Sequence, residues 1–332
     1  MKAMLLRAPA PVSQNSLEKA DVPEPRPGRG EILLKVGACG VCHTDLHTIE
    51  GELPLPKLPI VPGHQIVARV QAMGEGAGRF KKGDRVGVAW LNRTCGACDY
   101  CRRGQENLCE SAKFTGYDVD GGYAEYVTVA EDFAYPIPPG FDDAEAAPLL
   151  CAGVIGYRAL RLSDVVRGGR LGLFGFGASA HVAIQIARHW GCEVYVFTRS
   201  REHMELARKL GAAWSGTAKD KAPAKLTNAV LFAPAGELVH DALRALDKGG
   251  TLAINAIYLS PIPETEYGLI YDERTVRSVT ASTRRDAEEL LKLAGEIPIK
   301  TEVETFPLEE ANRALVALKK SRIRGAGVLI VN

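Results

Sequence analysis

Apolar and polar residues alternate in different ways in the two halves of this chain. Up to about residue 150, short apolar runs are separated by segments dense in proline and glycine. The runs predict strands at 31–40, 66–74, 84–90 and 123–129. Frequent turn residues between short strands are typical of a β-rich, barrel-like domain.

After Cys151, strand-like runs alternate with helical patterns, which is typical of a parallel α/β domain. The expected strands are 171–175, 193–198, 229–233 and 250–255. The expected helices are 178–190 and 201–210, which Gly191 and Gly211 end. The last segment, from about 285, predicts helices at 285–294 and 308–320 and a closing strand at 326–331.

The net charge, the N-terminal residues and the cysteine count indicate the partners, the compartment and the chemistry to expect. The 332 residues include 41 Lys and Arg against 40 Asp and Glu, for a net charge of +1. This balance predicts neither a nucleic-acid partner nor a membrane partner, because a basic footprint would show as an excess. The N-terminal residues lack the features of a secretory signal, so we expect a cytoplasmic protein. Disulfides are rare there, so the eight cysteines favour metal or redox chemistry.

Four of the cysteines form a local cluster with the spacing C-x2-C-x2-C-x7-C: Cys95, Cys98, Cys101 and Cys109. Four thiolates at this spacing can surround a tetrahedral ion and leave no position for substrate. We therefore predict a structural zinc that holds a short lobe, residues 92–112. A pair of disulfides and an iron–sulfur cluster are the alternatives.

Cys42, His64 and Cys151 are dispersed along the chain. Two thiolates and one imidazole are a ligand set of catalytic zinc sites with an open fourth position. Spacing alone does not join these three residues. Taken singly, a buried cysteine is usually a small hydrophobic residue and a lone histidine is usually a polar group with its hydrogen bonds satisfied.

A glycine-rich run follows the strand predicted at 171–175 and opens the helix predicted at 178–190. It comprises Gly175, Phe176, Gly177, Ala178, Ser179 and Ala180. Glycines here allow the backbone to approach a pyrophosphate, and the helix N-terminus adds N–H donors. This context predicts a dinucleotide site.

The residues that end the strand predicted at 193–198 indicate whether the cofactor is NAD(H) or NADP(H). NAD sites carry Asp or Glu about twenty residues past the glycines, whereas Thr198, Arg199 and Ser200 stand here. Hydroxyls and a guanidinium suit a 2′-phosphate. We predict NADP(H), with NAD(H) as the alternative.

These motifs occur in a familiar order: GVCHTDLH, VPGHQ, the four-cysteine cluster, GGYAEYV, LCAGVIGY and the glycine loop. The chain resembles the zinc-dependent alcohol dehydrogenases of the medium-chain dehydrogenase/reductase superfamily over essentially its whole length. The resemblance implies an α/β fold made of a GroES-like β-rich catalytic domain (1–151), a Rossmann coenzyme domain with a doubly wound parallel sheet (152–282) and a C-terminal return to the catalytic domain (283–332).

The resemblance also implies roles for the residues. Cys42, His64 and Cys151 would bind a catalytic zinc, which makes two zinc ions per chain. Hydride would pass reversibly between a zinc-bound alkoxide and the nicotinamide. Thr44 would accept the alcohol proton, and a relay would end at His47. Asp45 would orient His64, and His43 would lie near the cofactor pyrophosphate.

Two positions depart from the family pattern. Gln65 stands where Glu usually follows the zinc-binding His, and Ala326 stands where an Arg usually contacts the pyrophosphate. The neutral Gln65 should leave the zinc more electropositive and lower the pKa of a bound alcohol. The missing arginine gives Arg284 or His43 a larger expected share of cofactor binding.

Other predictions concern the remaining cysteines, the substrate and assembly. Cys39 and Cys192 are expected to be packing residues, and Trp90 and Tyr117 to line the substrate pocket. The default substrate is a small primary or secondary alcohol with its aldehyde or ketone, and the family implies a homo-oligomer, a dimer or tetramer. The rival functions are an aldehyde reductase working mainly in the reductive direction and a non-catalytic zinc- and nucleotide-binding protein.

Overall fold

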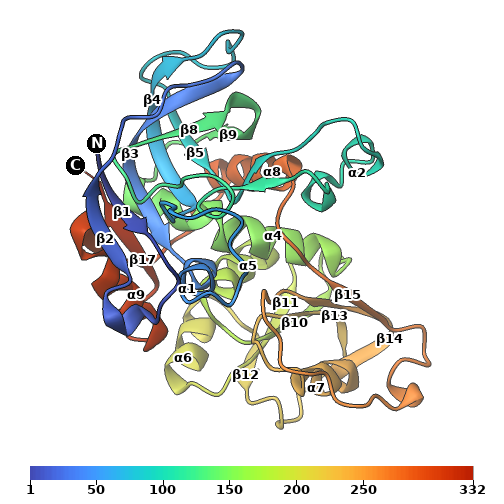
Figure 1. Cartoon of the computed structure of the whole chain (residues 1–332). Coiled ribbons are helices and arrows are strands. Elements are labelled where there is room, and N and C mark those ends of the chain that lie inside the picture. The colour runs from blue at the N-terminus through green and yellow to red at the C-terminus, as the bar shows by residue number, and fades with distance from the viewer. Residues whose placement is uncertain (332) are drawn as a thin grey trace. The chain divides into compact units, whose positions relative to one another are not determined.

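The computed structural model describes residues 1–331 (Figure 1). It divides into two compact units. Unit 1 is Met1–Cys151 together with the chain from Ala281 onward, and unit 2 is Ala152–Thr280. In the described residues, no helix has the length and apolar character needed to cross a membrane.

Unit 1 is built on a mainly antiparallel sheet around a long strand, β3 (Glu31–Val41). β3 pairs with β4 (Gln65–Met73), β8 (Tyr126–Ala130) and β17 (Ala326–Ile330), and β4 continues the sheet. The outer strands are β5 (Arg85–Val88), β9 (Ala134–Pro136) and β16 (Val303–Pro307). The alternating apolar positions of β3 and β4 enter the unit's main core, so the sequence pattern and the burial agree.

Smaller elements surround this sheet. Two hairpin-like pairs join β1 (Lys2–Leu6) with β2 (Leu17–Asp21) and β6 (Leu91–Arg93) with β7 (Lys113–Phe114). The helices of unit 1 are α1 (His43–Ile49), α2 (Asp99–Arg102), α3 (Asp143–Ala146), α8 (Arg284–Glu296) and α9 (Ala311–Lys319). Its 3-10 turns are η1 (Val12–Gln14), η2 (Glu106–Leu108), η3 (Glu131–Phe133), η4 (Ala147–Leu150) and η6 (Leu308–Glu310).

Unit 2 is a parallel six-stranded sheet in the order β12-β11-β10-β13-β14-β15. Its strands are β10 (Arg170–Phe174), β11 (Glu193–Phe197), β12 (Trp214–Gly216), β13 (Leu226–Leu231), β14 (Leu246–Ile254) and β15 (Thr275–Ser278). Its helical elements are α4 (Ala152–Leu162), α5 (Ala178–His189), α6 (Arg201–Lys209), α7 (Leu238–Ala245) and η5 (Tyr267–Leu269). This strand order reverses direction between β10 and β13, as in dinucleotide-binding sheets.

The elements predicted from the alternation of apolar residues are confirmed, with ends shifted by a few residues. The predicted helix 308–320 begins as the 3-10 turn η6 and continues as α9. The pattern did not predict α4, α7 or the edge strands β12 and β15. All four residues of β15 are exposed, so it has no apolar face to reveal it.

Candidate active site and metal centres

The first ligand of the dispersed site, Cys42, lies where β3 ends and α1 begins. It is the N-cap residue of α1, and its backbone N–H donates to Asp45 Oδ2 at 2.8 Å. A carboxylate three residues into a helix satisfies an N–H that the helix itself cannot pair. The turn that ends β3 therefore fixes the thiol of Cys42 and the carboxylate of Asp45 together.

His64 occupies the last position before β4, and its side chain is almost completely buried. Its Nδ1 atom lies 3.0 Å from Asp45 Oδ1. Its Nε2 atom is buried and has no hydrogen-bond partner among the described residues. A buried nitrogen without a partner is costly, and a metal ion is the partner that the arrangement lacks.

Cys151 completes the group from the end of η4, with its Sγ atom 3.7 Å from Cys42 Sγ. The ligand atoms of Cys42, His64 and Cys151 all lie within 4.8 Å of one another. Two sulfurs bound to one tetrahedral zinc at ~2.3 Å would stand about 3.8 Å apart. The three residues therefore fit a zinc ion and leave its fourth position open.

The protonation of these ligands reflects their burial and mutual contacts. The hydrogen bond with Cys151 holds the pKa of Cys42 well below its usual range, and the same contact keeps the pKa of Cys151 well above it. Burial disfavours a charged His64, but the Asp45 carboxylate outweighs this and raises the pKa of His64 to about 10. Zinc binding must displace such protons, so its affinity falls as the pH is lowered.

The other residues predicted for this site lie on α1 or beside the ligands. Thr44 Oγ1 is 3.8 Å from Cys42 Sγ, and the ring of His47 pairs through Nδ1 with the carboxylate of Glu52. His43 is exposed. Gln65 is buried as the first residue of β4 and faces Gly40 of β3.

Trp90 lies beside the site, with its ring centroid 6.3 Å from that of His64. Tyr117 donates its hydroxyl to the carbonyl oxygen of Pro54 at 2.5 Å. Cys39 and Cys192 are free and buried, as expected of packing residues.

The four-cysteine lobe forms the second metal-binding group. The Sγ atoms of Cys95, Cys98, Cys101 and Cys109 lie within 4.8 Å of one another, with contacts of 3.5 to 3.9 Å. This spacing suits the ~3.8 Å edges of a zinc tetrahedron and exceeds a disulfide bond of ~2.05 Å. Backbone N–H groups of Ala97 and Cys98 point at Cys95 and lower its pKa to about 6, which favours the thiolate that zinc needs.

Arg284 was predicted to bind cofactor, and the structure places it against this lobe. Its backbone N–H and its Nε both donate to Glu106 Oε1, at 2.9 and 3.0 Å. Its guanidinium also lies 5.0 Å from the ring centroid of Phe133. Glu106 lies between the third and fourth cysteines, so the pair fastens the lobe to α8. The sequence showed an acidic residue at this position but not its partner 178 residues away.

The glycine loop of unit 2 has the conformation that its sequence requires. Gly175 has φ +90°, and a Cβ there would stand 2.8 Å from the backbone nitrogen of Ala233. Gly177 is the N-cap of α5, and Ala178, Ser179 and Ala180 form its first turn. Backbone N–H groups at this helix start can therefore receive a pyrophosphate.

The residues that follow β11 carry no carboxylate. Ser200 is the N-cap of α6 and accepts from the backbone N–H of His203 at 3.2 Å. Thr198 Oγ1 accepts from the Ser200 N–H at 3.5 Å, and Arg199 is exposed. The arrangement offers hydroxyls, a helix N-terminus and a guanidinium that pairs with none of the other described residues.

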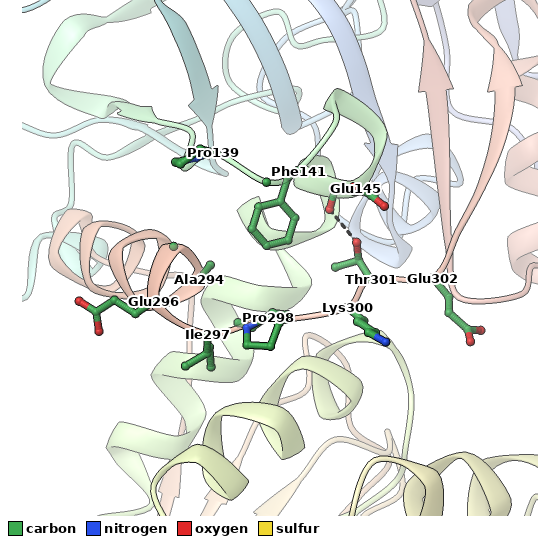
Figure 2. Close-up of a pocket in the computed structure, with 13 residues that line it drawn as sticks. Pro139, Phe141, Glu145, Ala294, Glu296, Ile297, Pro298, Lys300, Thr301 and Glu302 are labelled. Carbon is green, nitrogen blue, oxygen red and sulfur yellow. Dashed lines mark hydrogen bonds between the residues drawn. The ribbon is translucent and has the colours of Figure 1, made fainter.

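A separate cavity of about 650 Å³ lies in unit 1 between residues 139–145 and 294–302 (Figure 2). Thr301 Oγ1 donates to the carbonyl oxygen of Glu145 at its edge, at 2.8 Å. None of the residues that line it is a ligand of either metal centre. The cavity is therefore not the active site.

The class of protein follows from these features. A Cys2His zinc centre with an open position and a dinucleotide-binding sheet define a zinc-dependent oxidoreductase. Residues 28–139 match the family model "Alcohol dehydrogenase GroES-like domain", and residues 180–296 match "Zinc-binding dehydrogenase". The chain belongs to the zinc-containing medium-chain alcohol dehydrogenase family, and it is an NAD(P)-dependent alcohol dehydrogenase.

Individual relatives agree over nearly full length. A "Probable alcohol dehydrogenase AdhA" of Mycobacterium tuberculosis is 48% identical, across 100% of this chain and 97% of that one. An "Alcohol dehydrogenase" of Geobacillus stearothermophilus is 37% identical, across 95% and 96%. The solved cinnamyl alcohol dehydrogenase of Sorghum bicolor superposes with a TM-score of 0.90 at 28% identity, across 99% and 97%. The predicted fold class and reaction class are confirmed.

Proposed function

We propose that this alcohol dehydrogenase uses NADP(H) in preference to NAD(H). The observation that carries the proposal is the end of β11, where Thr198, Arg199 and Ser200 replace the carboxylate that would bind the ribose hydroxyls of NAD. A carboxylate would repel a 2′-phosphate, whereas a guanidinium and hydroxyls can donate hydrogen bonds to it. Arg199 is exposed, and within the part of the chain that the structure describes its guanidinium has no competing ion pair.

The test compares kcat/KM for the two cofactors in the wild type and two variants. Arg199→Ala should lower kcat/KM with NADP(H) at least tenfold, because a charge-assisted hydrogen bond contributes about 1.5–3 kcal/mol. It should leave NAD(H) nearly unchanged. Arg201→Ala is the matched control, since Arg201 lies within α6. A wild-type enzyme that prefers NAD(H) would overturn the proposal.

The proposed reaction interconverts small primary or secondary alcohols with aldehydes or ketones. A zinc ion held by Cys42, His64 and Cys151 would supply Lewis acidity that lowers the pKa of an alcohol hydroxyl. Thr44, half-buried beside Cys42, would accept the hydroxyl proton. His47 lies three residues further along α1, where i and i+3 side chains share a face, and would release the proton to solvent. The carbinol carbon would lose its hydride to the nicotinamide.

Thr44→Val tests the proton step, because it keeps the side-chain volume and removes the acceptor. It should lower kcat at least a hundredfold, the lower end of typical general-base effects, with both zinc ions retained. Thr48→Val, at a buried threonine of the same helix, is the control. Full activity of Thr44→Val would exclude the role. Rates measured in both directions on a panel of alcohols and aldehydes identify the substrate and the favoured direction.

We also propose that the enzyme is a homodimer, or a tetramer built from such dimers, joined at β15. Among the described strands, this strand pairs with β14 alone, and all four of its residues are exposed. The segment that joins β14 to β15, together with β15 itself, carries seven large exposed apolar side chains: Ile257, Tyr258, Ile262, Tyr267, Ile270, Tyr271 and Val276. A second copy related by a twofold axis would pair its own β15 with this edge and cover the apolar side chains.

Light scattering should then give a mass that is a multiple of the 35.7 kDa chain. Val276→Lys should shift the mass toward that of the monomer, because it places like charges opposite each other. Val166→Lys, at an exposed apolar residue outside the patch, should not. A wild type that is monomeric at micromolar concentration would contradict the proposal.

A further inference from the structure

Tyr123 is a fully buried tyrosine whose hydroxyl reaches the active site indirectly. Its Oη atom donates to Asp45 Oδ2 at 3.2 Å, and Asp45 in turn accepts from His64. Tyr123 belongs to the loop that precedes β8. None of the steps assigned to the zinc ligands, Thr44 or His47 uses it.

The backbone around Tyr123 is paired with the segment that leads to His64. The N–H of Tyr123 donates to the carbonyl oxygen of Pro62 at 3.0 Å. The N–H of Gly122 donates to the carbonyl oxygen of Gly63 at 2.9 Å. Gly63 has φ +94°, and a Cβ there would stand 2.3 Å from a ring carbon of Tyr123. The ring therefore packs directly on the residue that precedes His64, and no larger residue fits at position 63.

Asp45 is a buried carboxylate whose charge is satisfied by three donors. Oδ1 accepts from His64, and Oδ2 accepts from the N–H of Cys42 and the hydroxyl of Tyr123. The Cys42 N–H and the Tyr123 hydroxyl hold one oxygen of this carboxylate, and the other oxygen faces His64 Nδ1. Because Nδ1 is engaged with Asp45, Nε2 is the ring nitrogen that remains for a metal ion.

We propose that Tyr123 is a positioning residue for the catalytic zinc centre. Its hydroxyl holds the Asp45 carboxylate in the orientation that aims His64 Nε2 at the metal. Its ring packs on Gly63 and its backbone N–H binds Pro62, so it also holds the two residues that precede His64. Within the described residues, no hydrogen bond of Tyr123 reaches the cysteines of the lobe, so the zinc of the lobe should not depend on Tyr123.

Tyr123→Phe removes the hydroxyl and keeps the ring. Residues that orient a metal ligand typically change metal affinity 10–100-fold, so we expect zinc to leave the catalytic site about tenfold faster. The measurement is zinc release from the purified holoenzyme to a chromogenic chelator, with the zinc of the lobe as internal reference. Cobalt substituted at the catalytic site should show a shifted visible absorption spectrum, since the imidazole orientation changes.

Tyr135→Phe is the matched control. Tyr135 is also fully buried in unit 1, and its surroundings are the charges of Glu288, Arg284 and Glu106 rather than Asp45. This variant should release both zinc ions at wild-type rates and keep the cobalt spectrum. A Tyr123→Phe enzyme that behaves the same way would overturn the proposal.

A double-mutant cycle with Asp45→Asn separates positioning from general stability. If Tyr123 acts through Asp45, adding Tyr123→Phe to Asp45→Asn should change zinc release less than twofold, because the shared contact is already lost. A full tenfold effect in both backgrounds would contradict the role. Equal acceleration of both zinc ions, with a lower melting temperature, would also contradict it.

Discussion

The two metal centres of this enzyme satisfy one coordination geometry in opposite surroundings. The catalytic ligands come from three separated places in unit 1, at residues 42, 64 and 151, and His64 is almost completely buried. The ligands of the lobe lie within fifteen residues, and Cys95 is exposed. Helix α2, which begins after Cys98, has no buried residue. The folded domain therefore brings the ligands of the catalytic centre together. In the lobe, by contrast, the metal ion is expected to order the short segment that carries its ligands.

This difference predicts which property each ion controls. The catalytic site is embedded beside β3 and β4, whose apolar side chains form a core that does not need the metal. The lobe buries too little apolar surface to order itself, and structural zinc contributes folding free energy in such segments. Losing the first ion should remove activity, and losing the second should remove local structure.

Cys151→Ser should have the largest effect. It removes a thiolate from the catalytic centre, and Lewis-acid stabilisation worth several kcal/mol corresponds to a loss of at least ~10³-fold in kcat/KM. Metal analysis should find one zinc per chain in place of two, with nearly unchanged circular dichroism. Cys192→Ala, at a buried cysteine outside both centres, should retain both ions and activity. If Cys151→Ser kept its turnover, the catalytic zinc would not be required for the reaction.

Cys98→Ser tests the four-cysteine lobe, because it removes one of the four thiolates that would bind the structural zinc. One zinc should again be lost, but the result should be cleavage of residues 92–112 by a protease that leaves the wild type intact. The thermal midpoint should fall by several degrees, because a kilocalorie per mole corresponds to about 2–4 °C for chains of 150–250 residues. A protease-resistant lobe with only one zinc bound would show that packing, not metal, orders it.

The same contrast explains how much the sequence could predict. The lobe ligands follow from spacing alone, because thiolates three and eight residues apart can reach one ion without help from the rest of the fold. The catalytic ligands could be grouped only through the resemblance to known dehydrogenases. The ends of β3, β4 and η4 bring Cys42, His64 and Cys151 within 4.8 Å of one another, and no spacing in the sequence records this. The strands with one buried face were predicted from their alternation, while the exposed edge strand β15 left no pattern.

Long-range pairs between polar side chains were beyond sequence reasoning. Tyr123 is part of the GGYAEYV motif, but the motif does not predict its hydrogen bond with Asp45, which is 78 residues away in the sequence. Glu106 lies between two cysteines of the lobe, but the sequence does not predict its hydrogen bond with Arg284, which is 178 residues away. No periodicity records such pairs, because each depends on where separate loops meet.

Glu106→Gln tests whether the lobe also depends on its attachment to α8. The side chain of Glu106 is buried, whereas about a third of Arg284 is exposed, so solvent screens the pair. Removing the charge should lower stability by about 1 kcal/mol and speed protease cleavage of the lobe while both zinc ions remain. Glu288→Gln, at an exposed pair with Arg79, should change neither. Unchanged cleavage would mean that zinc alone holds the lobe.

Gln65→Glu tests the electrostatics of the catalytic centre. A Cβ on Gly40 would stand 2.8 Å from Gln65 Cδ, so the side chain is closely confined. A carboxylate there places negative charge near the metal and should disfavour ionisation of the alcohol. The acidic limb of the pH profile of kcat/KM for alcohol oxidation should move up by about one pH unit. An acidic limb that does not move would show that position 65 has no electrostatic role.

The smallest expected effect concerns Glu50, the residue that ends α1, the helix that begins after Cys42. Glu50 accepts from the N–H of Val12 at 2.9 Å and from Lys319 of α9 at 2.6 Å. Burial favours the neutral acid, but Lys319 and the Val12 N–H outweigh it and lower the pKa of Glu50. A lowered pKa contributes stability above the ordinary value of about 4.3, and this is lost as the pH falls below it.

Glu50→Gln should therefore cost at most about 1 kcal/mol at neutral pH, since half of Lys319 is exposed. The difference in thermal midpoint between wild type and variant should shrink as the pH falls below about 4, where the wild-type carboxylate also becomes neutral. Lys319→Met should reproduce the loss, and the double variant should add little to it. A difference that stays constant from pH 7 to 3 would mean that the charge of Glu50 does not hold α1 to α9. Helix α1 would then be fixed by its apolar contacts and by the hydrogen bonds of Asp45.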